Sequence, residues 1–422
     1  MVDIVTVIGT RPNFIKAAII NRSLQQRADG AAFTQYLVDT GQHYDYLLSK
    51  VFQEELGSLA VNQVLATGSG SHGTQMARMV GQLEAVFLEQ QPRAALVYGD
   101  TNSTLAGALA AVKLDIPVIH IEAGVRLPYR RRVPEEWNRV LTDHAAHLCF
   151  AVTEGGLASL EDEGIGPGRA VFTGDILYDL FLLTRDRAVA QSTYPSCLGL
   201  GQGKYHLATI HRVENTGSPE RVKEIFAALA KSEQPVVIPL HPRTKQTLAS
   251  AGVLSGLAAG TQLRIVDPLG YYDFQALLMG CDRVISDSGG VMREAYFAHK
   301  PCIVPRPYTW FPEIVESGWA VETGEDTELL LSAINGFRPP IRHEDLFGDG
   351  HAAERIVNEI SDFLRHGRSE PWTNAALSPC PSSVDLRAEV VLDAARGVCR
   401  DGQLPGHAPE GLARSGWATT RN

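Results

Sequence analysis

The chain lacks Cys-x-x-Cys pairs, a basic stripe, and any apolar run long enough to span a membrane. Its 6 cysteines are scattered through 422 residues, so the spacing indicates no zinc module, and we expect no metal site. The net charge of −10 argues against a nucleic-acid partner, because nucleic-acid binding needs clustered basic side chains. With no membrane span and no leader-like start, we expect a cytoplasmic protein with no membrane partner.

The length and the rhythm of the chain predict an α/β fold of two doubly wound domains. Apolar, β-branched runs alternate with amphipathic stretches, the pattern of parallel βαβ units. We predict strands at 4–8, 34–39, 94–98, 118–121, 148–151 and 171–173, and a second series at 206–209, 236–240, 263–266, 283–286, 302–304 and 319–321. The predicted domains are 1–175 and 176–350, followed by a helix at 351–366 that crosses back to the first domain and a mobile tail at 367–422.

Three acid-bearing segments fill the first third of the chain. Asp100 and Glu122 each end an apolar run, and Glu135 follows Pro134 at a helix start. Acids at the carboxyl ends of parallel strands meet in the ligand crevice of an α/β sheet, where they can move protons. Any one of them could merely cap a helix; the three together favour a reactive site.

Two strand-to-helix turns are candidates for binding an anion. Gly9-Thr10-Arg11-Pro12 opens a helix and adds a positive charge, although it lacks the glycines of the dinucleotide fingerprint and could be a plain turn. In Ser288-Gly289-Gly290 the small residues let a diphosphate approach, and Glu294 could accept ribose hydroxyl protons. The alternative is a serine N-cap followed by a tight turn.

Two further features allow more than one interpretation. His211 follows the run 206–209 and could donate a proton to a phosphate, or could be an ordinary loop residue. Glu135, Arg139 and Asp143 share one helix face, either as a surface ladder of ion pairs or with Arg139 fixing Glu135 in a reactive pose.

Together these segments resemble the non-hydrolysing UDP-N-acetylglucosamine 2-epimerases, in family order over roughly residues 1–366. The matching segments are Gly9-Thr10-Arg11-Pro12, Thr40-Gly41-Gln42-His43, Gly99-Asp100-Thr101, His120-Ile121-Glu122-Ala123-Gly124, Pro134-Glu135-Glu136 with Asn138-Arg139, His211-Arg212, Pro268-Leu269 with Phe274, and Ser286-Asp287-Ser288-Gly289-Gly290 with Glu294.

The resemblance implies two Rossmann-like domains facing across a cleft in the glycosyltransferase-B arrangement, a homodimer, and neither a redox cofactor nor a metal. The implied reaction inverts C2 of a UDP-sugar: anti elimination of UDP leaves a 2-acetamidoglucal, and UDP adds back as the opposite face of C2 is protonated. The implied catalytic set is Asp100, Glu122, Glu135, Arg139 and His211. Arg11, Phe274, Ser288, Gly289, Gly290 and Glu294 are expected to hold UDP, and Gln42 and His43 to form an allosteric site for UDP-N-acetylglucosamine.

The chain also departs from the family pattern. Asn13 stands where glutamate is usual, Met292 and Arg293 replace glutamine and glutamate, and Trp310 and Phe311 replace a charged Glu-Arg pair at the crevice rim. These changes suggest a paralogue specialised for a secondary-metabolite pathway. Three rivals remain open: a hydrolysing epimerase that releases UDP and N-acetylmannosamine, a glycosyltransferase, and a protein that binds nucleotide sugars without turnover.

Overall fold

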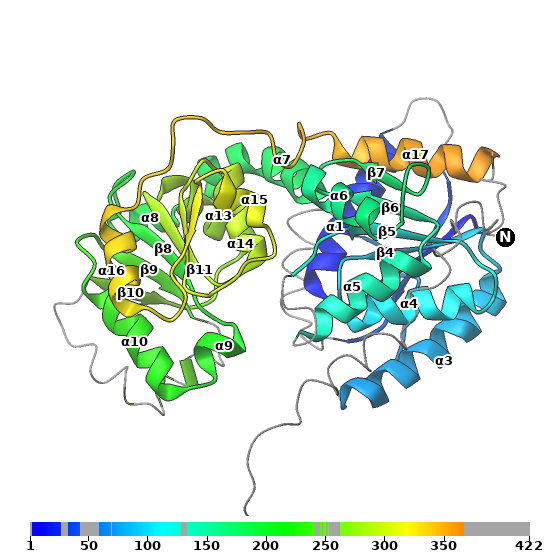
Figure 1. The fold of residues 1–422 in the computed structure, drawn as a ribbon, viewed down its shortest axis with the longest axis horizontal. Coiled ribbons are helices and arrows are strands. Elements are labelled where there is room, and N and C mark those ends of the chain that lie inside the picture. Colours follow the sequence, from blue (N-terminus) through cyan, green and yellow to red (C-terminus); the bar gives the residue numbers. More distant parts are fainter. Residues whose placement is uncertain are drawn as a thin grey trace, which may run out of the picture. The chain divides into compact units, whose positions relative to one another are not determined.

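The computed structural model contains two separate parallel β-sheets (Figure 1). It describes residues 2–26, 33–42, 59–68, 70–127, 133–240, 245–246, 248–249, 252 and 262–366, and all of these belong to one compact unit. The predicted tail at 367–422 lies outside the described residues.

The first sheet has the strand order β3-β2-β1-β4-β5-β6-β7, with every pair parallel. Helices cover both faces, so β1 and β4 are buried along their whole length, which explains their predominantly apolar sequences. The strands are β1 Ile4–Ile8, β2 Gln35–Asp39, β3 Gln63–Val64, β4 Ala94–Tyr98, β5 Val118–Ala123, β6 Leu148–Ala151 and β7 Ala170–Phe172. The intervening helices are α1 Arg11–Gln25, α3 His72–Gln90, α4 Asn102–Val112, α5 Pro134–Ala145 and α6 Glu154–Asp162.

The second sheet repeats this topology in the order β10-β9-β8-β11-β12-β13, again with parallel pairs. In both sheets the order reverses beside the first strand, and ligands bind at such switch points in doubly wound folds. The strands are β8 His206–Thr209, β9 Val236–Pro239, β10 Leu263–Val266, β11 Arg283–Ser286, β12 Cys302–Val304 and β13 Ala320–Glu322. The helices are α8 Tyr194–Cys197, α9 Val213–Thr216, α10 Pro219–Ala230, α13 Tyr271–Gly280, α14 Gly289–Phe297, α15 Pro312–Glu316 and α16 Thr327–Gly336.

Two further helices, α7 and α17, pack against the helices that surround the sheets. Helix α7 (Ile176–Gln191) follows the last strand of the first sheet and packs against α1, α13 and α14. Helix α17 (Ala352–His366) packs its apolar face against α1 and α7. The carboxylate of Asp179 on α7 accepts hydrogen bonds from the backbone N–H groups of Ala352 and Ala353, so it caps the start of α17.

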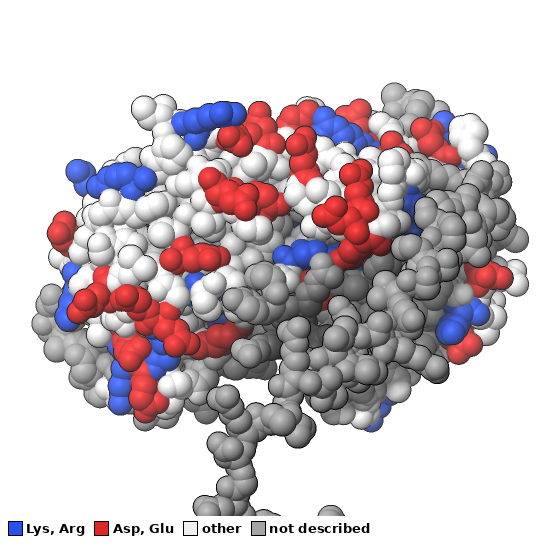
Figure 2. Space-filling view, in the orientation of Figure 1, with Lys and Arg blue, Asp and Glu red and all other residues white. Residues whose placement is uncertain are grey.

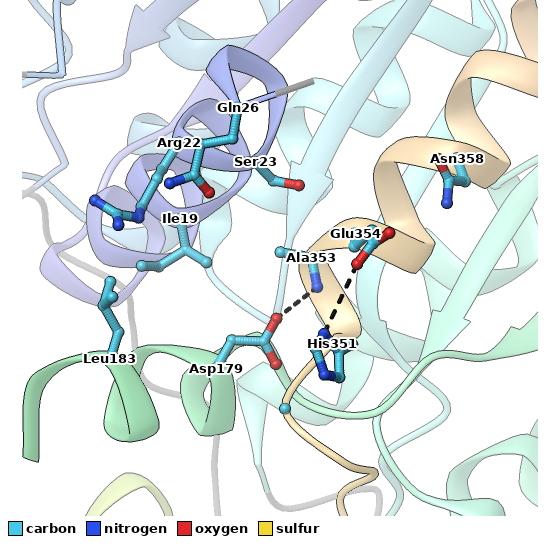
Figure 3. Close-up of a pocket in the computed structure, with 11 residues that line it drawn as sticks. Ile19, Arg22, Ser23, Gln26, Asp179, Leu183, His351, Ala353, Glu354 and Asn358 are labelled. Atoms are coloured by element: carbon cyan, nitrogen blue, oxygen red, sulfur yellow. Dashed lines mark hydrogen bonds and ion pairs between the residues drawn. The ribbon is translucent and has the colours of Figure 1, made fainter. Parts of the chain in front are cut away.

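A polar cavity of about 640 Å³ lies among α1, α7 and α17 (Figure 3). Figure 3 shows Asp179 bonded to Ala353, and His351 facing Glu354, at the start of α17. None of the residues predicted to form the functional site lines this cavity.

The predicted fold class is confirmed, and the strand predictions hold closely. Seven strands (β1, β4, β6, β8, β10, β11 and β12) begin and end at the predicted residues, and five others differ by one or two residues. The sequence prediction missed β3, because two residues are too few to show a periodic pattern.

On the face shown in Figure 2, acidic and basic side chains are interspersed. Isolated exposed ion pairs of this kind contribute little to stability. None of the helices within the described ranges is long and apolar enough to cross a membrane.

Candidate active site

A cavity of about 530 Å³ brings together the carboxyl ends of strands from both sheets. The turns after β1 and β4 and the end of β5 supply one group of lining residues, and the turns after β8 and β11 supply another. Nine of the predicted site residues line it: Asp100, Glu122, Arg139, His211, Phe274, Ser288, Gly289, Gly290 and Glu294.

Glu122 lies at a bulge near the end of β5. Its neighbours Ile121 and Ala123 pair with consecutive residues of β6, and Glu122 itself has a φ of 69°. A left-handed φ at a residue other than glycine stores strain, which is most often found at functional sites. Lys16 on α1 donates to Oε2 of Glu122, and Nη1 of Arg293 on α14 lies 3.2 Å from the same oxygen. Burial raises the pKa of Glu122, but the charges of Arg293 and Lys16 outweigh this effect and hold the pKa well below its usual value.

Asp100 follows β4 and forms an ion pair with Arg139 on α5. Arg139 also lies 3.3 Å from the buried Glu136, and the neighbouring Asn138 donates to the backbone carbonyl of Asp100. The surface-ladder interpretation of α5 is therefore wrong, because Arg139 is 4% exposed and is held against Asp100. The ion pairs of Arg139 go to Asp100 and Glu136, so they do not support the alternative in which Arg139 fixes Glu135.

Asp143, which lies on the same face of α5 as Glu135 and Arg139, is fully buried. Its carboxylate contacts several groups close to Asp100 and Glu122. Its carboxylate lies 2.5 Å from Nδ1 of His120 and 2.7 Å from Nη1 of Arg126, and it accepts a hydrogen bond from the backbone N–H of Gly124. Burial raises the pKa of Asp143, but His120 and Arg126 lower it by more, so the group is held as a carboxylate. Nε2 of His120 lies 2.7 Å from the carbonyl oxygen of Gly99. This network fixes the backbone on both sides of the site, next to Asp100 and next to Glu122.

His211 lies after β8 and is positioned by its backbone. The buried carboxylate of Asp287 accepts hydrogen bonds from the N–H groups of His211 and Arg212 and from the side chain of Asn215. The ring of His211 is 43% exposed and borders the cavity, with Nδ1 3.4 Å from Asp287. A backbone tethered in this way holds the imidazole at the cavity edge.

The start of α14 borders the cavity and has space beside its first residues. Ser288 accepts a hydrogen bond from Val291 N–H and is thus an N-cap, as the alternative interpretation of the motif proposed. A Cβ added at Gly289 or Gly290 would meet nothing nearer than 3.5 Å, so both glycines leave room beside the helix N-terminus. Free N–H groups at a helix start attract phosphate. The cap and the anion site are therefore compatible.

Trp310 and Phe311, which replace the charged pair usual in the family, are in contact with arginine side chains. The guanidinium groups of Arg212 and Arg306 lie 4.5 and 4.4 Å from the ring centre of Trp310, and Arg293 lies 4.6 Å from that of Phe311. Both rings are buried and line the cavity. At this rim, cations therefore stack on aromatic rings.

Two of the predicted residues that the structure describes do not line this cavity. Glu135 is half-buried at the start of α5 and is not among the lining residues. Gln42 accepts hydrogen bonds from the backbone N–H and hydroxyl of Ser103 and is not among the lining residues either. The side chain of Arg11 and the whole of His43 lie outside the described residues. Within the described ranges, no group of three or more His, Cys, Asp or Glu side chains could hold a metal ion.

A sequence model of the family described as UDP-N-acetylglucosamine 2-epimerase matches residues 25–361 of this chain. The chain belongs to this epimerase family. It is 38% identical over 364 residues to a UDP-N-acetylglucosamine 2-epimerase homolog of Methanococcus maripaludis, covering 85% of this chain and 99% of the homolog. It is also 38% identical over 366 residues to the UDP-2,3-diacetamido-2,3-dideoxy-D-glucuronate 2-epimerase of Pseudomonas aeruginosa, with 85% and 99% coverage.

The fold is shared with solved members of the epimerase family. The crystal structure of the Methanocaldococcus jannaschii UDP-GlcNAc 2-epimerase, in complex with UDP-GlcNAc and UDP, matches with a TM-score of 0.77 and 35% identity, over 85% of this chain and 99% of that one. The two parallel sheets thus form the glycosyltransferase-B arrangement of this family. The resemblance inferred from the motifs is confirmed.

The sequence analysis missed three charged residues at or beside this cavity, Lys16, Asp175 and Arg293. A signal existed for Lys16, which interrupts the apolar run of α1 and is 3% exposed. Asp175 likewise follows a strand, as Asp100 does, and it caps α7. Arg293 gave only the signal that it departs from the family pattern, because its partners lie more than 100 positions away in the chain.

Proposed function

We propose that this protein is a non-hydrolysing epimerase that interconverts UDP-N-acetylglucosamine and UDP-N-acetylmannosamine. The observation that carries the proposal is the single cavity in which Asp100, Glu122, Arg139 and His211 face the open start of α14. Two further findings support the same substrate: the chain belongs to the epimerase family, and the similar Methanocaldococcus jannaschii enzyme was crystallised in complex with UDP-GlcNAc and UDP.

In the proposed reaction a carboxylate removes the C2 proton as the C1–O bond breaks. The electron pair of the C–H bond becomes the C1=C2 double bond, and UDP leaves with the electrons of the C1–O bond. UDP then attacks C1 of the 2-acetamidoglucal while C2 receives a proton on its opposite face. Two faces require two proton-handling groups, and the carboxylates that line the cavity from the first sheet are Asp100 and Glu122. Glu135 stays a prediction as the third acid.

The leaving diphosphate gathers negative charge during elimination. We assign its stabilisation to His211 and to the N–H groups of Gly289 and Gly290, at the start of α14 where it borders the cavity. To Glu294, which lines the cavity one turn later on α14, we assign the ribose hydroxyls of UDP. The same parts serve the return step, because UDP must stay bound until it adds back.

Incubation with UDP-N-acetylglucosamine in D₂O, followed by proton and phosphorus NMR, tests the proposal. We expect deuterium at C2 together with a second UDP-sugar signal, because the proton is exchanged with solvent before reprotonation. Accumulation of UDP and free N-acetylmannosamine would instead establish the hydrolysing reaction. Absence of both exchange and release would contradict the proposal and favour a protein that only binds.

A second candidate substrate follows from the Pseudomonas aeruginosa relative, which is as similar as the archaeal one and by its name acts on a UDP-diacetamido-glucuronate. A uronate needs a cation for its carboxylate. Arg212 borders the cavity, and among the described residues its Nε has no hydrogen-bond partner. The same NMR assay with both nucleotide sugars, compared by kcat/KM, decides between them.

A further inference from the structure

Arg293 connects the two halves of the candidate site. It lies on α14, beside the second sheet, and is 5% exposed. Nη1 lies 3.2 Å from Oε2 of Glu122, at the end of β5, and 2.6 Å from Oδ2 of Asp175, the N-cap of α7. The ring of Phe311 lies 4.6 Å from the guanidinium carbon. The two departures from the family pattern at 293 and 311 are therefore in contact with each other, and Arg293 also contacts a predicted catalytic acid.

The position of Arg293 on α14 links the proposed diphosphate site at the start of this helix to the Glu122 carboxylate. Gly290 and Arg293 are three residues apart on α14, so they lie on neighbouring turns of one rigid element. A diphosphate at the start of α14 would fix this helix, and with it the guanidinium that contacts Glu122. Asp175 adds a fixed anchor, because it is fully buried and its other oxygen accepts the hydrogen bond of Leu177 N–H.

The charged groups around Glu122 come from four helices. Lys16 on α1 and Arg293 on α14 contact its carboxylate, Arg139 on α5 acts from farther away, and Asp175 on α7 lies on the far side of Arg293. Without Arg293, the carboxylate of Glu122 would keep one cation in contact, Lys16. Removal of Arg293 is therefore expected to leave Glu122 folded in place and raise its pKa.

We propose that Arg293 is a positioning residue that holds the Glu122 carboxylate for proton transfer at C2 and ties it to the diphosphate-binding helix. This inference rests on the proposed function for its role in turnover, whereas its electrostatic part concerns Glu122 itself. Arg293 acts through Glu122 and needs no contact with the sugar.

The test compares Arg293→Met and Arg293→Lys with the wild-type protein. The pKa of Glu122 is followed by carbon-13 NMR of glutamate labelled at Cδ, with Glu122→Gln used to assign the signal. We expect Arg293→Met to raise this pKa by at least about one unit, since one charge in contact has been lost, and Arg293→Lys to keep most of the lowering. A pKa unchanged in Arg293→Met overturns the proposal, whichever sugar the protein uses.

Turnover supplies the second readout. If Arg293 positions the Glu122 carboxylate, kcat should fall about tenfold or more in Arg293→Met, because a carboxylate that is no longer held in place meets the sugar in the reactive geometry less often. Arg293→Lys should restore most of kcat, and the Kd for UDP should stay within about threefold in both variants. A kcat that does not fall, or a lysine variant no better than methionine, contradicts the positioning role.

Two controls complete the design. Arg365→Met removes an exposed arginine at the end of α17 and should leave both the pKa of Glu122 and kcat unchanged. If Arg293→Met does not fold, Arg293→Gln keeps a hydrogen-bond donor without the charge and carries the same expectation. Wild-type protein without turnover would refute the proposed function, yet the pKa comparison would still decide whether Arg293 controls Glu122.

Discussion

Asp100→Asn and Glu122→Gln are each expected to lower kcat at least about 100-fold while leaving UDP binding nearly intact. An amide keeps the shape of the side chain but cannot take a proton from carbon. Both acids line the cavity, and each is held by a cation from a different helix: Asp100 by Arg139 and Glu122 by Lys16. The diphosphate region at the start of α14 is untouched by either change. The measurements are kcat by NMR and the Kd for UDP by calorimetry.

The matched control is Glu354→Gln, which removes an exposed carboxylate from the polar cavity at α17. It should retain full turnover, which would show that the reaction belongs to the smaller cavity between the sheets. If either active-site amide variant kept a near-normal kcat, the corresponding acid would have no proton to move and the proposed roles would be wrong. If both lost UDP binding as well, the effect would be on folding or on the binding site.

The sequence predicted those parts of the fold that depend on local pattern. Strands such as β4 and β12 are buried along their whole length, so their apolar runs show where they begin and end. The turns that follow them are short, so acids and glycines just after a strand must lie at the carboxyl edge of the sheet. This is why Asp100 and Ser288 could each be placed at the carboxyl edge of its own sheet from the amino-acid sequence alone, whereas a common cleft was implied by the family resemblance.

The sequence did not predict which charged side chains face the protein interior and which face solvent. The spacing of Arg139 and Asp143 places them on one side of α5, but spacing alone cannot say whether that side meets water or the protein. In the structure α5 packs against α4 and β5, which buries Asp143 completely and turns Arg139 toward Asp100. Arg293 was harder still, because its partners Glu122 and Asp175 come from strand and helix ends that meet α14 only in the folded chain. Such ion pairs depend on the topology of the fold, and no local sequence pattern indicates them.

Asp143→Asn is expected to lower the free energy of unfolding by about 3 kcal/mol, because it removes a buried charge that two basic groups face. His120 would lose its carboxylate partner, whereas Arg126 keeps a second ion pair, with Glu163 at 2.7 Å. The measurement is urea unfolding at pH 7.5. Asp362→Asn, which breaks an exposed ion pair on α17, is the control and should change the free energy by less than about 0.5 kcal/mol.

The pKa of Asp143 determines how the stability effect of Asp143→Asn depends on pH. The pKa of Asp143 is lower in the folded protein than in the unfolded chain, since His120 and Arg126 outweigh the effect of burial. Its contribution to stability is therefore complete above the unfolded pKa of about 3.9 and is lost as the pH falls through the lower, folded value. The difference between wild type and Asp143→Asn should shrink as the pH falls below the unfolded aspartate pKa of about 3.9 toward the lower, folded value. A difference that did not shrink in this range, or one at pH 7.5 no larger than that of Asp362→Asn, would contradict the stabilising role of the Asp143 carboxylate. The variant should also turn over more slowly, because His120 fixes the carbonyl of Gly99 and Asp143 fixes the N–H of Gly124.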